Sequence, residues 1–405
     1  MPFRIALSGL NAASSHLNVT SNNIANVNTT GFKGSRAEFA DLFAVSTGDI
    51  SDTSTGNGVR LQRVSQQFTQ GNIDFTENNL DLAISGEGFF TLEGADGRVF
   101  TRAGNFSLNN DGFVQNNLGE RLQVYPPAGD GSFNTGQLQD LRLVTGENPP
   151  QATSGIRAEL NLPADAEPPE VTDFDPDDPL SFNNSRSITV YDSLGNRHDA
   201  TTYFVKSEDT NEWETYLYIG DEEIGGPDTL TFNADGSLAT PDPATIDYTP
   251  FDPGNGAEPL EISIDYRGST QFGGSFGVTE LSQDGFAVGR LTGFDVDGDG
   301  VASARFSNGQ TEQLGKVAMA KFDNPQGLQK VGDTRWAESF AAGEAQLGEA
   351  GASGFGEIQA GALEGANIDL TQELVEMITA QRNFQANAQM ISTSDAITQT
   401  IINIR

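Results

Sequence analysis

The chain has no cysteine, only two histidines and few cations, and each scarcity removes a class of chemistry. Without cysteine there is no disulfide, no thiolate nucleophile and no cysteine metal site. His16 and His198 are too few for a histidine-based zinc site. The net charge is −35, whereas a surface that binds nucleic acid is basic. We therefore expect no cofactor, no zinc centre and no nucleic-acid partner.

Long apolar runs are also missing. No stretch approaches the roughly 20 apolar residues of a membrane span, and the mean hydropathy is −0.38. The first residues, Met1-Pro2-Phe3-Arg4-Ile5, lack the charged region and the apolar region of a cleaved signal peptide. We expect a soluble chain that does not insert into a membrane and carries no cleaved signal.

The negative charge is concentrated in the middle of the chain. Residues 1–70 hold five cations against four carboxylates, and residues 358–405 hold two cations against five carboxylates. Like charges repel when they are packed tightly, so a crowded polymer core is best built from near-neutral segments with acidic parts outside it. The charge distribution matches that layout, and it is equally consistent with a salty habitat.

Both ends of the chain carry the apolar spacing of a helical seam. Gaps of three and four residues alternate, as at the a and d positions of a coiled coil. Other positions of the first helix are mostly Ser and Asn, which are poor helix formers and allow close approach of neighbours. Matching seams around a non-helical middle predict self-assembly rather than catalysis. The predicted polymerisation interface comprises Phe3, Leu10, Leu17, Ile24, Val27, Leu370, Leu374, Met377, Phe384, Ile391, Ile401 and Ile402.

The middle of the chain shows short alternating runs separated by turn signals such as Asp96-Gly97 and Asn110-Asp111-Gly112. These signals predict a mainly β protein with long terminal helices, whose middle forms two β-rich domains, one inserted in the other. Residues 163–179 hold prolines and carboxylates and no base, so we expect a loop that buries no apolar area. A Gly/Ala-rich link is expected over 341–365. The predicted parts are 1–70 (helix and extended arm, with breaks at Gly48, Gly56 and Gly58), 71–145 (inner β domain), 146–284 (inserted outer β domain), 285–357 (inner β domain, second part) and 358–405 (C-terminal helix).

Several stretches carry a family resemblance. Ser21-Asn22-Asn23-Ile24-Ala25-Asn26 with Asn28-Thr29-Thr30-Gly31-Phe32-Lys33 resembles the signature of bacterial flagellar rod and hook proteins. The stretches that resemble the hook protein in particular are 68–73, 81–90, and 306–310 with 324–328; the pattern is completed by 375–378 and 381–387. The signature residues are Asn22, Asn23, Asn26, Asn28, Thr29, Gly31 and Phe32.

The resemblance implies a structural subunit rather than an enzyme. Hook subunits polymerise into a short curved tube that couples the motor rod to the filament and transmits torque as a universal joint. The implied partners are further copies of the chain, the rod protein, the hook cap, the hook–filament junction protein and the flagellar export apparatus. The implied location is the extracellular hook of the flagellum, at the basal body, reached without a cleaved signal peptide.

Three alternatives remain open from the sequence. The distal rod protein shares the terminal signatures, but rod proteins lack a large inserted domain. A secreted acidic adhesin would give the terminal seams no role. Asp295, Asp297 and Asp299 resemble the start of an EF-hand calcium loop, yet position 12 is Phe306 instead of Glu, so we expect a turn there. His16 is expected at an interface or facing a channel, and His198 is expected to be exposed.

Overall fold

The computed structural model describes residues 2–42, 56–95, 97–129, 131–143 and 146–403. The chain divides into two compact units. Unit 1 consists of Met1–Thr145, Gly293–Arg305 and Thr311–Arg405, and unit 2 consists of Gly146–Thr292 and Phe306–Gln310. Unit 2 is therefore an insertion in the sequence of unit 1. Most of the described elements are strands, and the two long helices lie at the ends of the chain, which confirms the predicted fold class.

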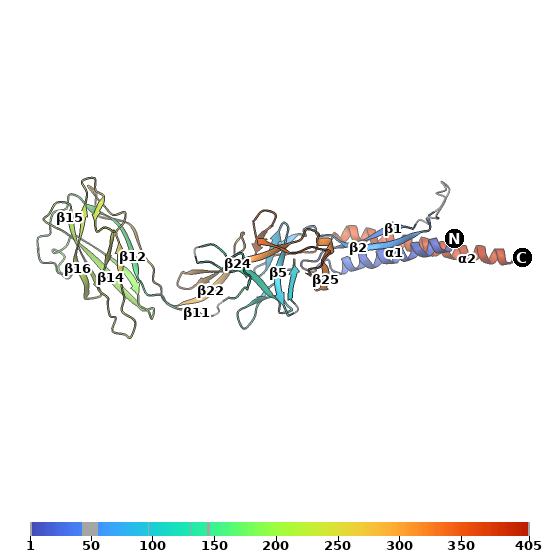
Figure 1. Ribbon diagram of the computed structural model, residues 1–405, viewed down its shortest axis with the longest axis horizontal. Coiled ribbons are helices and arrows are strands. Elements are labelled where there is room, and N and C mark those ends of the chain that lie inside the picture. Colours follow the sequence, from blue (N-terminus) through green and yellow to red (C-terminus); the bar gives the residue numbers. More distant parts are fainter. Residues whose placement is uncertain (1, 43–55, 96, 130, 144–145, 404–405) are drawn as a thin grey trace. The chain divides into compact units, whose positions relative to one another are not determined.

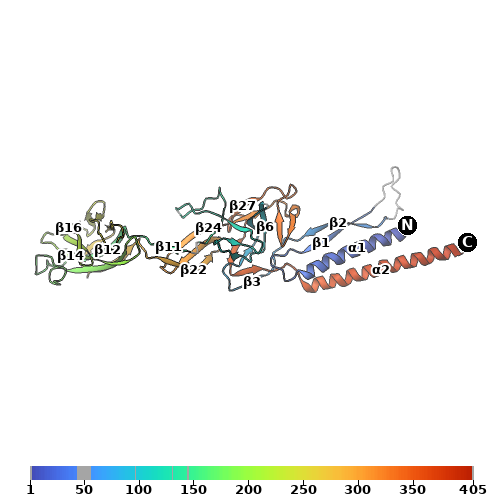
Figure 2. The same cartoon turned by 90° about the horizontal axis from the view of Figure 1, so that it is seen from below.

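The terminal helices α1 (Pro2–Ala25) and α2 (Leu370–Asn403) lie side by side in both views, with the two chain termini at the same end of the pair (Figures 1 and 2). Small residues allow this pairing. A Cβ at Gly9 would lie 2.4 Å from Asn387 Oδ1, and Ala13 and Ala380 are buried. Neither helix is long and apolar enough to cross a membrane over its described residues.

The predicted extended arm is a β-hairpin in its described part. Strand β1 (Ser35–Asp41) pairs antiparallel with β2 (Val59–Gln66), with an irregularity between Glu38 and Phe39. The predicted break at Gly48 lies outside the described residues. The hairpin contacts α1, so arm and helix form one structural element at this end of unit 1.

The β part of unit 1 is built around β24 (Thr311–Lys321), which pairs with β5, β9, β23 and β27. Its aromatic core includes Phe89, Phe100, Phe322 and Trp336, packed edge to face with ring centroids 4.9–6.1 Å apart. The expected turn at Asn110–Gly112 is confirmed, with Gly112 at a φ of +85°, and Asp96 lies outside the described residues. The other strands are β3 (Ile73–Phe75), β4 (Leu82–Ser85), β5 (Phe89–Gly94), β6 (Gly97–Thr101), β7 (Ser107–Leu108), β8 (Val114–Gln115), β9 (Arg121–Tyr125), β10 (Gln139–Asp140), β25 (Gln329–Gly332) and β26 (Arg335–Ala337), with a 3₁₀ turn at Pro325–Gly327.

The predicted link 341–365 and the predicted helix start at 358 are both wrong. This segment contains β27 (Gln346–Glu349), β28 (Glu357–Ala360) and β29 (Ala362–Glu364), which pair with β24, β4 and β3. The glycines and alanines serve close packing instead of flexibility. A Cβ at Gly356 would meet the Ser85 carbonyl oxygen at 2.5 Å, and Ala350 and Ala362 are buried. The helix itself begins at Leu370.

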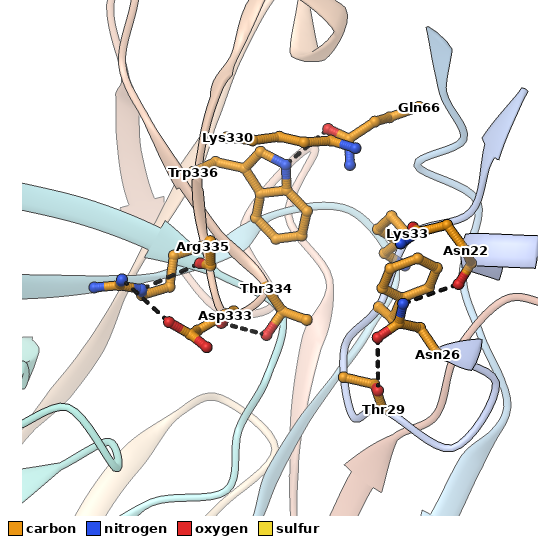
Figure 3. A pocket seen from close by; sticks show the side chains of 12 residues that line it. Asn22, Asn26, Thr29, Lys33, Gln66, Lys330, Asp333, Thr334, Arg335 and Trp336 are labelled. Carbon is orange, nitrogen blue, oxygen red and sulfur yellow. Dashed lines mark hydrogen bonds and ion pairs between the residues drawn. The ribbon is translucent and has the colours of Figure 1, made fainter. Parts of the chain in front are cut away.

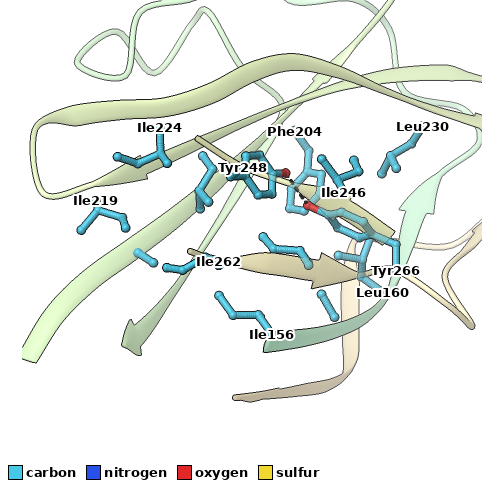
Figure 4. Close-up of a cluster of buried hydrophobic side chains, with 14 of the residues drawn as sticks. Ile156, Leu160, Phe204, Ile219, Ile224, Leu230, Ile246, Tyr248, Ile262 and Tyr266 are labelled. Carbon is cyan, nitrogen blue, oxygen red and sulfur yellow. Dashed lines mark hydrogen bonds between the residues drawn. The ribbon is translucent and has the colours of Figure 1, made fainter. Parts of the chain in front are cut away.

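Unit 2 has its core between two five-stranded sheets. One sheet joins β13 to β17 in sequence order, and the other is organised around β12, which pairs parallel with β19 and β20 and antiparallel with β21. The core includes Trp213, and Figure 4 shows Phe204 and Tyr266 within it. Its strands are β11 (Glu147–Asn148), β12 (Gly155–Pro163), β13 (Asn184–Tyr191), β14 (Arg197–Lys206), β15 (Glu212–Ile219), β16 (Glu222–Phe232), β17 (Leu238–Thr240), β18 (Thr245–Asp247), β19 (Ser263–Asp265), β20 (Thr270–Phe272) and β21 (Gly277–Gln283); β22 (Gly289–Val296) and β23 (Val301–Phe306) run from one unit into the other.

The acidic segment 163–179 is a loop beyond the end of β12, but it does bury apolar surface. Phe174 stacks on Tyr216 with ring centroids 4.1 Å apart and also contacts Tyr203 and Phe182. The expectation that the loop buries no apolar area is therefore wrong. The Phe174 ring and Ala166, which packs against the core of unit 2, hold the loop against the sheet.

Candidate assembly surface at the paired terminal helices

The predicted seam residues divide into two groups in the helix pair. Leu10, Leu17 and Ile24 on α1 are half-buried, as are Met377, Phe384 and Ile391 on α2. Met377 and Phe384 share the α2 face that carries Ala380 and Asn387, which lie toward α1. Val27 lies in the turn after α1 and is half-buried. The side chain of Ile401 lies outside the described residues.

A second group of apolar side chains faces away from the pair. Phe3, Leu370, Leu374 and Ile402, all predicted seam residues, are exposed, as are the further residues Leu7, Val375, Ile378, Met390 and Ile397, with Val375 at 60%. Apolar surface gathered along one helix marks an interaction site, whereas scattered apolar residues need no partner. The helix pair thus buries part of the predicted seam and leaves the rest exposed.

The Asn-rich signature joins the helix pair to the arm. The Asn23 side chain is buried; its Oδ1 accepts a hydrogen bond from Ser35 N at 2.9 Å, and its Nδ2 donates to Ser35 O at 2.8 Å and to Glu373 Oε1 at 3.0 Å. One amide therefore connects α1, β1 and α2. Burial raises the pKa of Glu373, with the neighbouring Glu376 charge acting in the same direction.

Three buried charges lie where the helices meet the β part of unit 1. Glu364 is 0% exposed and accepts hydrogen bonds from Lys33 Nζ at 2.7 Å, from Arg102 Nη1 at 3.2 Å and from Gly71 N at 2.8 Å. Lys33 also donates to Thr69 O at 2.7 Å. Burial lowers the pKa of Lys33 and of Arg102, and the Glu364 charge opposes that shift. This ion cluster holds the turn after α1, the start of the β part and the strand before α2 together.

The remaining signature residues shape the turn that reaches this ion cluster. Gly31 has a φ of +68°, and a Cβ there would lie 2.4 Å from Ala103 N, so both conformation and space require glycine. Asn26 Nδ2 donates to Asn22 O at 2.9 Å, and Thr29 Oγ1 donates to Asn26 Oδ1 at 3.2 Å. Phe32 is half-buried and Asn28 is exposed. The signature thus specifies a helix end and a turn.

The two histidines of the chain make structural contacts. His16 lies between the helices, with Nε2 3.7 Å from Glu376 Oε2, in agreement with an interface position. His198 is half-buried, which corrects the expected exposure, because it contacts Asp192 and packs edge-on against Phe251.

Asp297 caps the β22–β23 turn through Val301 N. Within the described residues, no group of three His, Cys, Asp or Glu side chains is placed to hold a metal ion, and this includes Asp295, Asp297 and Asp299.

The ion cluster was not found from the sequence. Lys33 and Glu364 are 331 residues apart, and a lone lysine or glutamate beside a glycine carries no local signal. The one available sign was that Lys33 closes the turn motif and Glu364 lies in a nearly neutral terminal segment. Pairing between them depends on the fold alone.

These features define a class of protein: a structural subunit whose paired terminal helices present unpartnered apolar surface. Four family models match the chain. They are described as flagella basal body rod protein (residues 3–33), flagellar hook protein FlgE/F/G D1 domain (83–173), flagellar basal body protein FlaE D2 domain (161–286) and flagellar basal body rod FlgEFG protein C-terminal (359–404).

Curated relatives match from end to end. The flagellar hook protein FlgE of Escherichia coli K12 is 38% identical and that of Salmonella typhimurium LT2 is 37% identical, each with 100% of both chains covered. The hook protein of Borreliella burgdorferi is 32% identical over 98% of both chains. The chain therefore belongs to the bacterial flagellar hook protein family. A crystal structure of Helicobacter pylori hook protein FlgE2 shares the fold, with a TM-score of 0.56 at 17% identity, covering 72% of this chain and 100% of that one.

Proposed function

We propose that copies of this chain assemble into the flagellar hook, a curved extracellular tube that couples the motor rod to the filament and transmits torque as a universal joint. The observation that carries the proposal is the end-to-end match to hook proteins, which covers the inserted unit 2 as well as both terminal helices. A distal rod protein would not need unit 2, and an adhesin would not need the terminal helices.

The terminal helices are the proposed core of the tube. The exposed apolar residues of α2 gain a partner when neighbouring helix pairs pack around a central channel. The proposed polymerisation interface is the predicted set from Phe3 to Ile402. Its half-buried members hold α1 against α2, and its exposed members hold one copy against the next.

The ion cluster suits a part that transmits torque. Torque on the helix core reaches the outer β domains through the turn at Lys33 and the strand that ends at Glu364. Breaking a buried ion pair costs about 3–5 kcal/mol because one charge is left uncompensated. A cluster of three charges therefore resists separation of the helices from the β part.

The inserted outer domain is proposed to span 146–284, and its deletion tests whether it shapes the tube. Strand β11 pairs with β22 through Glu147 and Arg290, so the chain enters and leaves unit 2 on neighbouring strands. Replacing 146–284 by a short Gly/Ser linker should leave assembly intact and change the curvature of the tube. Unchanged curvature would remove the shape-setting role.

The remaining partners are proposed from the family. They are the rod protein at one end of the tube, the hook cap and the hook–filament junction protein at the other, and the flagellar export apparatus, which would carry the chain without a cleaved signal.

Deleting the gene in its own bacterium separates the candidate functions. If the chain is the hook subunit, electron micrographs of basal bodies should show complete rods with no curved tube, and the gene should restore the tubes. Shortened rods would identify a distal rod protein. Complete flagella would overturn the proposal and favour an adhesin.

A further inference from the structure

Unit 1 presents a fully exposed phenylalanine on a fixed turn. The relative exposure of Phe340 is 106%, the largest among the apolar side chains that the structure describes. The backbone on both sides of it is held: Ser339 Oγ donates to Gly327 O at 2.5 Å, and Asn324 Nδ2 donates to Ala341 O at 2.8 Å. Since the turn is ordered in advance, a partner that covers this ring does not have to order the backbone.

A pocket of about 330 Å³ lies near the opposite end of the β25–β26 hairpin (Figure 3). Trp336 and Thr334 lie on one side of it, and Asn22, Asn26 and Phe32 contribute to its lining. The Trp336 ring is fixed by a hydrogen bond of 2.8 Å from Nε1 to Gln66 Oε1. The Trp336 ring is only 2% exposed, so the half-buried Phe32 offers most of the aromatic surface against which a guest ring can pack edge to face or offset.

Phe340 does not fill the pocket of its own copy, since its ring is fully exposed and it is not among the residues that line the pocket. In the hairpin, Gly332 pairs with Arg335 at the turn and Gln329 pairs with Ala337 at the other end, and Phe340 lies three residues beyond Ala337. A projecting side chain and a pocket on different patches make a head-to-tail contact, and such contacts build open helical arrays.

The charges around the two patches are complementary. Glu338 and Glu344, both exposed, flank Phe340 in the sequence. The pocket lining holds the cations Lys33, Lys330 and Arg335 against the single carboxylate Asp333, and the Lys330 ammonium group donates to Ser35 Oγ at 3.2 Å. In a chain of net charge −35, two acidic surfaces would repel each other, so a cation at the receiving surface favours this pairing over others.

We propose that Phe340 of one copy inserts into the pocket formed by Trp336, Thr334, Phe32 and Asn26 of the next copy along the tube. This contact rests on the proposed function, because it exists only in the assembled polymer. It adds a contact in which the β part of one subunit meets the end of α1 and the β25–β26 hairpin of its neighbour.

Disulfide trapping tests the contact directly, since the chain has no cysteine of its own. A variant with Phe340→Cys and Thr334→Cys is assembled, oxidised and run on a denaturing gel without reductant. A disulfide within one copy would leave the chain at the monomer position on the gel, so only bonds between copies can give a ladder. A ladder of dimers, trimers and longer species is expected, with monomers from each single variant. A pair of Phe340→Cys and Asp111→Cys is the matched control and should give no ladder.

The outcomes separate this contact from the proposed function. Tubes that form but yield only monomers after oxidation would overturn the contact and leave the hook assignment intact. A wild-type chain that builds no tubes under any assembly condition would overturn both.

A truncation supplies an independent measurement that does not depend on cysteine chemistry. Phe340→Ala should raise the critical concentration for assembly at least tenfold, equal to about 1.4 kcal/mol, and Phe340→Leu should recover most of the loss. A critical concentration of Phe340→Ala equal to that of the wild type would contradict the proposal.

Discussion

Replacing Glu364 by Gln tests the ion cluster at the base of the helices. The substitution keeps the size of the side chain and removes the only carboxylate that contacts both Lys33 and Arg102 among the described residues. Two buried cations are then left facing a neutral amide. Removing one partner of a buried ion pair destabilises by about 3–5 kcal/mol. In a unit of this size each kcal/mol shifts the melting temperature by about 2–4 °C, so a fall of roughly 6–20 °C is expected.

The two tryptophans give a separate signal for each unit. Trp336 is buried in the β part of unit 1, and Trp213 is buried in unit 2. Melting is followed by fluorescence in a Trp213→Phe background for unit 1 and in a Trp336→Phe background for unit 2. Glu364→Gln should lower the midpoint in the first background and leave the second unchanged, because the sites do not share partners.

An exposed ion pair provides the matched control. Glu38 contacts Arg63 at 2.6 Å on the surface of the β1–β2 hairpin. Surface ion pairs contribute little to stability, so Glu38→Gln should have the same melting temperature as the wild type. If Glu364→Gln and Glu38→Gln had the same melting temperature, the buried ion cluster would not hold the helices to the β part.

Three further predictions follow from the helix pair and its turn. Leu17→Asp or Phe384→Asp should block tube formation and leave Trp213 fluorescence native, since an unpaired buried carboxylate costs several kcal/mol; normal tubes would contradict the helix-core assignment. Gly31→Ala should lower the melting temperature of unit 1, because the φ of +68° and the 2.4 Å approach to Ala103 N exclude a Cβ; an unchanged midpoint would contradict this reading of the turn. The pKa of Glu373 is raised in the folded state. Its contribution to the free energy of unfolding is therefore fully present below the ordinary pKa of 4.5, where the carboxyl is protonated, and is lost as pH rises through the folded-state pKa. The melting temperature of Glu373→Gln, followed by helical circular dichroism, should therefore be higher than that of the wild type at neutral pH and close to it at pH 4. Equal melting temperatures at neutral pH would show that the buried Glu373 charge does not destabilise the fold.

The strands and helices were largely readable from the sequence, because their signals are local. Alternating runs and Asp-Gly turns identify strands such as β14 and β15, and the three-and-four spacing identifies the helices. Segment 341–365 was misread because glycine and alanine are typical of flexible links as well as of closely packed strands. Its strands β28 and β29 form because they pair with β4 and β3, which lie far away in the sequence.

The candidate site was readable only in part. The apolar spacing predicts Leu17 and Phe384 as seam residues, and both are half-buried, but the spacing does not show which apolar residues the helix pair leaves exposed. That division depends on how closely small residues such as Gly9 let α1 approach α2. The roles of Asn23 and Glu364 depend on contacts across hundreds of residues, which no local pattern encodes.

Electron microscopy of the purified protein, concentrated at near-neutral pH, tests the central claim of self-assembly through the terminal helices most directly. The full chain should form tubes with helical order, and a matched chain ending before Leu370 should stay monomeric with both β units folded. Tubes formed equally well without α2 would contradict the account, because the surface that drives assembly would then lie elsewhere.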